Sequence, residues 1–289
     1  MNLNKLFILI LSLLVVIGCR KDVTKPVEPI ESNLTIFIIN DQQAQIDNFA
    51  KVKHIIDEEK KDTDVLVTCG GDIFSGNPVV DNYVEKGYPM IDMMNKVGVN
   101  MAVIGNHEFD YGQVILKKRM EQANFDWICA NVDMANTGIP QPFEYKTLHA
   151  GDLKITFLGL IETNGKPKAT IPSTHPNRVQ GIHFERPEDI VFQYADIKEQ
   201  ENSDIYIALT HIGHTGRNGA LGDFQLAQQY PYFDLIIGGH SSQLIDTVVN
   251  DIPVFQAGSY LEYIGKIELQ VKDKKVQKYN FELIDLNAY

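Results

Sequence analysis

Residues 101–110 read MAVIGNHEFD, and this stretch decides the fold because an apolar run changes there into a cluster of polar side chains. The apolar residues 101–104 predict a short strand that is buried on both faces and ends at Gly105. Open α/β sheets bind ligands at the carboxyl ends of their strands, where the amide, imidazole and carboxylate of this stretch would lie. The alternative for this stretch alone is a strand followed by a polar loop that caps the next helix.

Other strand-like runs of the chain end in the same way. A polar residue follows each of the apolar runs near residues 34–40, 64–69, 204–209 and 233–237, and glycine lies beside most of these positions. A lone histidine at a strand end is more often an ordinary loop residue, but several polar residues at one sheet edge favour a shared site. Carboxylate, imidazole and amide ligands together are typical of Zn, Mn or Fe(II) sites. The candidate ligands are Asp41, Asp72, Asn106, His211 and His240.

The order of the predicted elements indicates an α/β domain. Helical spacing of apolar residues alternates with strand-like runs in the first half of the chain, which predicts helices over residues 48–61, 89–97 and 111–124 and a strand over 126–131. The second half predicts a hairpin from residues 143–147 and 154–161, a long surface loop over 164–187 and helices over 187–199 and around 225–230. It ends in strands without helices between them, over residues 247–249, 254–256, 264–271 and 276–283.

Composition and charge narrow the class of protein. A hydrophobic fraction of 44% among 289 residues is ordinary for a globular protein and argues against disorder. The net charge of -12 argues against a nucleic-acid backbone or an anionic lipid surface as the main partner. Bound cations would still allow such an acidic protein to bind phosphate. Cys69 and Cys129 lie in strand-like runs and are predicted to be buried thiols rather than halves of a disulfide framework.

Residues 1–19 are predicted to be a secretion signal. The apolar core that follows Lys5 is shorter than the ~20 residues of a membrane-spanning helix. Residues 16–19 read VIGC and resemble the bacterial lipoprotein processing box, which implies cleavage before Cys19, acylation of its thiol and a lipid anchor in the bacterial cell envelope. The alternative is an ordinary secretory signal with an incidental cysteine. Residues 20–32 are predicted to be a flexible tether, and residues 33–289 a single large domain.

The strand-end motifs resemble those of a known enzyme family and occur in the same order. The chain is similar to the calcineurin-like binuclear metallophosphoesterases, and within them to the N-terminal catalytic domain of the 5′-nucleotidase family. The resemblance implies a four-layer α/β/β/α sandwich of two mixed sheets flanked by helices. It also implies a metal-dependent phosphoesterase that hydrolyses phosphate monoesters, including nucleotides. The matching segments are IND at 39–41, GGD at 70–72, GNHEFD at 105–110, LTH at 209–211 and GGHS at 238–241.

The resemblance implies a pair of divalent cations, of Zn, Mn, Fe or Mg, bridged by Asp72. One ion would be bound further by Asn106, His211 and His240, and the other by Asp41. The ions would activate water as hydroxide for in-line attack on the phosphorus of a small phosphorylated substrate. They would also neutralise the charge that builds up on the phosphoryl oxygens.

The resemblance assigns no metal to His107. This histidine would stabilise the phosphate and protonate the departing oxygen, with Asp110 fixing its orientation. Proton transfer of this kind needs a donor whose ring is held by a second group, and a spacing of three residues in the chain suits a histidine–carboxylate pair. His107 and Asp110 are therefore the predicted catalytic residues.

Two positions depart from the family pattern. Gln43 stands where the family has histidine, and Ser242 where it has histidine or glutamine. Both residues would serve the ion on the Asp41 side, so we expect one firm metal site and one weak site that tolerates harder ions such as Mg or Mn. If the loop shifts by one residue, Gln243 would replace Ser242. The alternative function is a degenerate lipoprotein that binds a metal or a phosphorylated ligand with little turnover.

The resemblance also raises the question of a partner. Relatives of the 5′-nucleotidase type carry a C-terminal domain that binds the nucleoside, whereas this chain ends at Tyr289, about where the catalytic domain stops. A separate substrate-binding protein that bears this domain is therefore expected. Specificity for nucleotides is implied only by the family resemblance.

Overall fold

The computed structural model describes residues 31–216 and 219–289. The predicted signal, Cys19 with its predicted acylation, and residues 20–30 of the predicted tether lie outside the described residues. The first strand begins at Ser32, one residue before the expected start of the domain. Within the described ranges, no helix is both long and apolar enough to cross a bilayer.

The first sheet contains the strand-end motifs of the N-terminal half. Strands β1 to β4 run parallel to one another, while β13 is antiparallel to β1 and β14 antiparallel to β13. Because parallel strands share a direction, the carboxyl ends of β1, β2 and β3 meet at one edge. The spatial order is β14 (Lys275–Asp285), β13 (Tyr263–Lys272), β1 (Ser32–Ile39), β2 (Asp64–Cys69), β3 (Met101–Val103) and β4 (Asp126–Ile128).

The second sheet contains the histidine motifs of the C-terminal half. Its inner strands β12, β10, β9 and β7 are parallel, and β11 and β6 pair antiparallel at its edges. A small additional sheet pairs β5 (Val132–Asp133) with β8 (His183–Phe184). The spatial order is β11 (Leu244–Val249), β12 (Ile252–Ala257), β10 (Leu235–Ile237), β9 (Ile205–His211), β7 (Leu153–Ile161) and β6 (Tyr145–Ala150).

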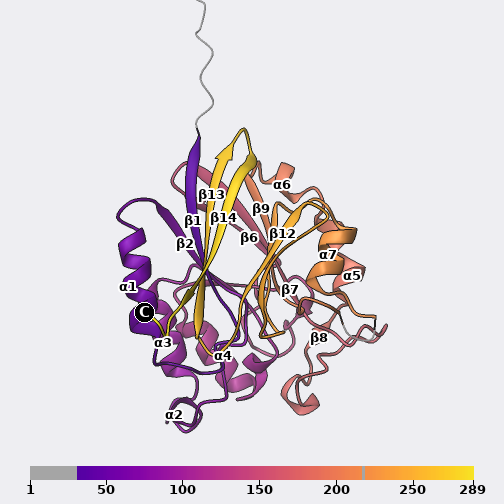
Figure 1. Cartoon of the computed structure of the whole chain (residues 1–289). Coiled ribbons are helices and arrows are strands. Elements are labelled where there is room, and N and C mark those ends of the chain that lie inside the picture. The colour runs from indigo at the N-terminus through magenta and orange to yellow at the C-terminus, as the bar shows by residue number, and fades with distance from the viewer. Residues whose placement is uncertain (1–30, 217–218) are drawn as a thin grey trace, which may run out of the picture.

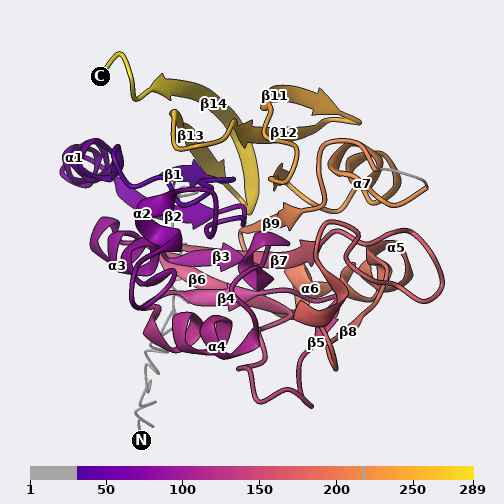
Figure 2. The same cartoon turned by 90° about the horizontal axis from the view of Figure 1, so that it is seen from below.

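Helices cover the outer face of each sheet, as Figure 1 and Figure 2 show for α1 and α3 on one side and α5 and α7 on the other. The first sheet is covered by α1 (Phe49–Glu59), α2 (Pro78–Asp81), α3 (Tyr88–Val97) and α4 (Gln113–Gln122). The second is covered by α5 (Pro187–Ile190), α6 (Ile197–Gln200) and α7 (Asp223–Gln229). Short 3-10 helices lie at His107–Phe109 (η1), Pro176–Arg178 (η2) and Val191–Tyr194 (η3).

The apolar residues of β1 show why four layers form. Phe37 and Ile39 pack toward the α1 helix, whereas Ile36 and Ile38 pack between the two sheets against residues such as Phe157. Successive side chains of a strand point to opposite faces, so a continuous apolar run indicates a strand covered on both faces. A further cluster fills the space between the second sheet and its own helices. The predicted α/β/β/α sandwich is confirmed.

The predicted helix over residues 187–199 is wrong as a continuous helix. The structure divides it into α5, η3 and α6. Its carbonyl groups are taken by tyrosine hydroxyls of neighbouring elements: Tyr232 donates to Val191 O at 2.7 Å, and Tyr206 donates to Tyr194 O at 3.0 Å. These tertiary hydrogen bonds replace part of the helical ladder. The predicted loop over 164–187 likewise contains η2 and β8, which pairs with β5.

Both cysteines among the described residues are free and buried, as predicted. Desolvation raises the pKa of Cys69 and of Cys129 to about 12 each, because burial disfavours the thiolate. Both side chains therefore stay protonated at neutral pH and behave as small apolar groups of the core, not as nucleophiles.

Candidate metal centre

The strand ends of the two sheets meet, and glycine makes the close approach feasible. The loop after β2 touches the loop after β10: a Cβ on Gly239 would lie 2.2 Å from Gly70 O, and a Cβ on Gly70 would lie 2.7 Å from Gly238 O. A Cβ on Gly71 would lie 2.7 Å from His211 Nδ1. Any side chain at these positions would force the two loops apart. The glycines beside the candidate ligands therefore bring the two sheet edges together.

Four of the candidate ligands converge on one point. His211 Nε2 lies 3.1 Å from Asp72 Oδ1 and 3.1 Å from Asn106 Oδ1. His240 Nδ1 lies 3.0 Å from the same Asn106 oxygen. The ligand atoms of the two histidines and Asp72 all lie within 4.8 Å of one another, and Asp72 and His211 are buried. Carboxylate, amide and imidazole atoms at these distances match the ligand types of a divalent transition-metal site.

The surroundings of His211 favour positive charge beside Asp72. Its Nδ1 lies 2.6 Å from the Gly70 carbonyl oxygen, which can only accept, so Nδ1 carries a proton. In the neutral ring, Nε2 therefore has the lone pair, and it faces the oxygens of Asp72 and Asn106. Burial lowers the pKa of His211, but Asp72 outweighs it and raises that pKa to about 10. Burial likewise opposes the ionisation of Asp72, but His211 holds the pKa of Asp72 at about 2. The residues present therefore fit a bound divalent cation.

The Asp41 side of the cluster has a poorer set of ligands. Both carboxylate oxygens of Asp41 accept the His240 backbone N–H, at 3.1 and 3.0 Å, and one also accepts Asn40 Nδ2 at 2.6 Å. Burial raises the pKa of Asp41 to about 6, and the negative charge of Asp72 adds to this shift. The charge of His211 acts in the opposite direction and lowers the pKa. Gln43 donates its amide nitrogen to Asp72 Oδ2 at 3.3 Å. The structure thus brings Asp41 and Gln43 beside Asp72, whereas Ser242 and Gln243 are exposed.

His107 and Asp110 form a pair at the edge of the cluster. His107 Nδ1 lies 2.7 Å from Asp110 Oδ2, which also accepts the Ser75 hydroxyl at 2.5 Å. The hydrogen bond to Asp110 raises the pKa of His107 to about 9. The opposite ring atom, Nε2, lies 3.9 Å from Asp72 Oδ2, and the His107 backbone N–H donates to Asp72 Oδ1 at 2.9 Å. The free ring nitrogen therefore faces the converging ligands.

Comparison with known proteins supplies the family. Residues 34–243 match the sequence profile described as calcineurin-like phosphoesterase, which is well over half of the chain. The chain belongs to the calcineurin-like phosphoesterase family. The resemblance stated from the strand-end motifs is thereby confirmed, and members of this family are phosphoric ester hydrolases that use divalent metals.

Curated relatives of this chain include 5′-nucleotidases. It is 29% identical over 266 residues to a 5′-nucleotidase of Vibrio cholerae, covering 81% of this chain and 47% of the relative. It is 30% identical over 251 residues to the UshA protein of Escherichia coli, covering 77% of this chain and 44% of that protein. The chain thus spans about half the length of these curated relatives.

Solved structures share the fold of this phosphoesterase. The structure of YfkN from Bacillus subtilis, described as a calcineurin-like phosphoesterase, aligns with a TM-score of 0.73 at 21% identity, covering 89% of this chain and 92% of that one. The structure of a 5′-nucleotidase precursor from Thermus thermophilus aligns with a TM-score of 0.74 at 20% identity, covering 88% of this chain and 54% of that one. At this identity the likeness concerns the fold alone.

Glu108 is a supporting residue of the candidate site that no sequence pattern identified. Its buried carboxylate accepts the backbone N–H groups of Asp72 at 3.0 Å, Ile73 at 2.6 Å and Gly105 at 2.6 Å. These bonds tie the loop after β2 to the loop after β3. A glutamate directly after the histidine of the motif was visible in the sequence, but its backbone partners were not.

Replacing Glu108 with glutamine is expected to destabilise the fold by about 1–3 kcal/mol, because an amide NH₂ cannot accept the backbone donors that the carboxylate satisfies. The free energy of unfolding in urea, measured without added metal, would show this loss. The exposed Glu58→Gln variant is the matched control and should unfold like the wild type. Equal stability of all three proteins would contradict the structural role of Glu108.

A buried chain of hydrogen bonds positions the loop that carries His240. Thr210 Oγ1 donates to Asp223 Oδ1 at 2.5 Å, Gln256 Nε2 donates to Asp223 Oδ2 at 2.8 Å, and Ser241 Oγ donates to Gln256 Oε1 at 2.6 Å. Burial raises the pKa of Asp223 to about 7. The chain connects α7, β9 and β12 to this loop. Asp223 is the first residue of α7 and does not follow an apolar strand, so no local sequence signal distinguishes it.

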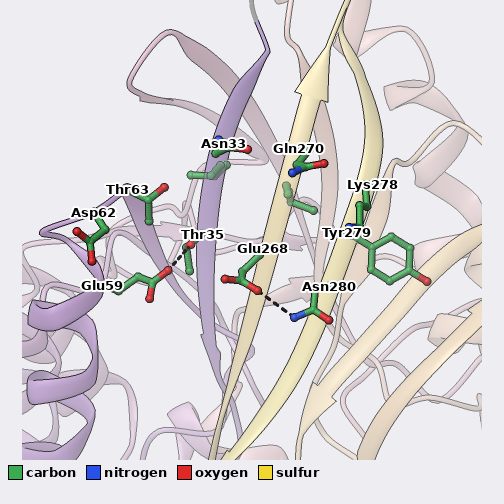
Figure 3. Close-up of a pocket in the computed structure, with 12 residues that line it drawn as sticks. Asn33, Thr35, Glu59, Asp62, Thr63, Glu268, Gln270, Lys278, Tyr279 and Asn280 are labelled. Atoms are coloured by element: carbon green, nitrogen blue, oxygen red, sulfur yellow. Dashed lines mark hydrogen bonds between the residues drawn. The ribbon is translucent and has the colours of Figure 1, made fainter.

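A separate hollow of about 360 Å³ lies at the opposite end of the first sheet, near the start of β1. Two of its acidic residues have hydrogen-bond partners: Figure 3 shows Thr35 with Glu59 and Asn280 with Glu268. Lys266 lies 2.8 Å from Glu59 and neutralises part of this charge. The candidate ligands lie after the carboxyl end of β1, so this hollow does not belong to the metal centre.

Proposed function

We propose that this chain is a metal-dependent phosphoesterase that hydrolyses phosphate monoesters, with nucleoside monophosphates as the preferred class. The observation that supports it is the convergence of Asp72, Asn106, His211 and His240 beside a histidine–carboxylate pair. The names of the relatives, 5′-nucleotidase among them, support the substrate class. The residues that would bind one cation are these four, and Asp41 and Gln43 would serve a second cation bridged by Asp72.

The chain's own residues perform defined tasks in this proposal. Bound divalent cations would polarise the phosphate and lower the pKa of water. His107 binds the phosphate and gives the proton on Nε2 to the departing oxygen, since its Nδ1 is held by Asp110. Ser75 fixes the Asp110 carboxylate because its hydroxyl donates to Oδ2, the same oxygen that accepts the hydrogen bond from His107 Nδ1.

The test of this function is the hydrolysis of p-nitrophenyl phosphate and of AMP by the purified protein. The metal-free protein should be inactive, and added Mn or Zn should restore turnover that EDTA removes. A diester such as bis-p-nitrophenyl phosphate should be hydrolysed more slowly. A protein that binds the cations yet hydrolyses none of these substrates would favour the alternative of a degenerate binding protein, which the residues Gln43 and Ser242 motivate.

The two cation sites are expected to differ in affinity. Gln43 presents an amide nitrogen to Asp72, and Ser242 is exposed, so the Asp41 side offers fewer good ligands than the His211 side. Metal analysis after dialysis should find one retained Zn or Mn ion, with a second binding only at higher concentration. Gln43→His should increase the affinity of the second site. Two equally tight ions in the wild type would refute this asymmetry.

For the location of the enzyme, the VIGC sequence at residues 16–19 supports a lipid anchor on Cys19 in the bacterial cell envelope. Metabolic labelling with a radioactive fatty acid tests this: the wild type should incorporate the label and Cys19→Ser should not. A wild-type protein that incorporates no label would contradict the lipid anchor and support the alternative of an ordinary secretory signal.

A further inference from the structure

Glu162 contacts the candidate metal centre although no motif includes it. It follows the last residue of β7, and its side chain is only 9% exposed. Its Oε2 lies 3.1 Å from His240 Nε2. The two residues lie far apart in the sequence, and they meet because β7 and β9 are neighbours in the second sheet while His240 follows β10.

The contact decides which nitrogen of His240 faces the ligand cluster. A neutral imidazole carries its proton on one ring nitrogen and a lone pair on the other. The Glu162 carboxylate accepts a hydrogen bond, so it favours the proton on Nε2. The lone pair is then on Nδ1, the atom that lies 3.0 Å from Asn106 Oδ1. Without Glu162 the ring could exchange its tautomer or rotate out of the cluster.

A merely structural carboxylate would be expected to satisfy both of its oxygens, because buried polar atoms are generally hydrogen-bonded. Glu162 Oε1 is buried and has no hydrogen-bond partner among the described residues. It borders a hollow of about 290 Å³ that His214 and His240 also line. The side chain thus contacts the ring of His240 directly, and Ser173, which lines the same hollow, also donates a hydrogen bond to this carboxylate.

We propose that Glu162 is a positioning residue that holds His240 in the Nε2–H form, so that Nδ1 donates its lone pair to the bound cation. The proposal rests on the metal centre of the proposed function. A carboxylate that accepts from the outer nitrogen of a metal-binding histidine fixes the ring and increases its basicity. Removal of such a partner typically lowers metal affinity by about 10–100-fold.

The experiment measures cation affinity, not turnover. The Kd for Zn or Mn would be determined by competition with a chromogenic chelator for the wild type, Glu162→Leu and Glu162→Gln. We expect a loss of about 10–100-fold for leucine and a smaller loss for glutamine, whose amide oxygen can still accept from His240. The matched control is Glu188→Gln on α5, because Glu188 also has a buried oxygen without a partner among the described residues. This control should bind the cation like the wild type.

A spectroscopic readout separates positioning from a general effect on the fold. In the zinc-loaded wild type, long-range proton–nitrogen correlation spectra should assign Nε2 of His240 as protonated and Nδ1 as metal-bound. The glutamine variant keeps the shape of the side chain, so these spectra remain interpretable if the leucine variant fails to fold. Zinc bound through Nε2 in the wild type would overturn the proposal.

The outcomes also distinguish this proposal from the proposed function. A wild type that binds the cation with the same Kd as a folded Glu162→Leu variant would overturn the role of Glu162 and leave the phosphoesterase proposal intact. A wild type that binds no cation at all would overturn the metal centre itself, and the role of Glu162 with it.

Discussion

Replacement of His107 with alanine is expected to lower kcat by roughly 10²–10⁴-fold while leaving the bound cations in place. The ring contributes Nε2 on the side of the ligand cluster, 3.9 Å from Asp72 Oδ2, but it is not one of the four converging ligands. Steady-state kinetics with p-nitrophenyl phosphate and metal analysis of the same samples would show both effects. Equal rates for wild type and variant would remove His107 from the mechanism.

The pH profile gives an independent check on the same residue. The hydrogen bond to Asp110 raises the pKa of His107 to about 9. A proton donor is active while protonated, so its contribution is complete below its pKa and is lost as the pH rises through that value. Asp110→Asn removes the carboxylate that raises the pKa, and the alkaline limb of the profile should therefore move to lower pH. A limb that stays in place in this variant would contradict the pairing.

Replacement of Asp72 with asparagine is expected to have the largest effect on the metal centre. The carboxylate contacts His211 Nε2 at 3.1 Å and accepts the His107 backbone N–H, and it would bridge the two cations. The amide keeps an acceptor for His107 but removes the negative charge. We expect both cation sites to lose most of their affinity and kcat/KM to fall by roughly 10³-fold or more, since several kcal/mol of charge stabilisation disappear.

Thermal unfolding offers a second measurement for Asp72→Asn. A cation that binds only the folded state raises the unfolding temperature, so Zn or Mn should stabilise the wild type and not the variant. The matched control is Gln43→Ala, which removes an amide donor next to the same carboxylate and should preserve the firm cation site. Persistence of the stabilisation in Asp72→Asn would show that the cation is bound elsewhere.

Local sequence patterns predicted the parts of the site that depend on single strands. Apolar runs followed by a polar residue, with glycine close by, located Asp72, Asn106 and His211. A strand buried on both faces is continuously apolar, and its next residues lie at the sheet edge. The number of layers was not contained in these patterns. It came from the family resemblance, since the packing of one sheet on another has no local signature.

The supporting residues could not be predicted, for a physical reason. Glu108 acts through backbone N–H groups, which every sequence has, and Glu162 acts through a contact that exists only after the second sheet has formed. The error over residues 187–199 has the same origin: helical periodicity is present, but hydroxyls of Tyr206 and Tyr232 take carbonyl groups of that segment. In this segment, tertiary hydrogen bonds override the local preference for a continuous helix.

The glycine contact between the loop of Gly70 and the loop of Gly239 has a consequence for biogenesis. Asp72 comes from the first half of the polypeptide and His240 from the last quarter, so neither portion holds a complete coordination shell by itself. A cation bound by both residues would therefore be taken up only after both portions have been synthesised, and it would link the two sheets. Separately expressed halves should acquire Zn or Mn only after they reassemble, which makes metal uptake a reporter of complete folding.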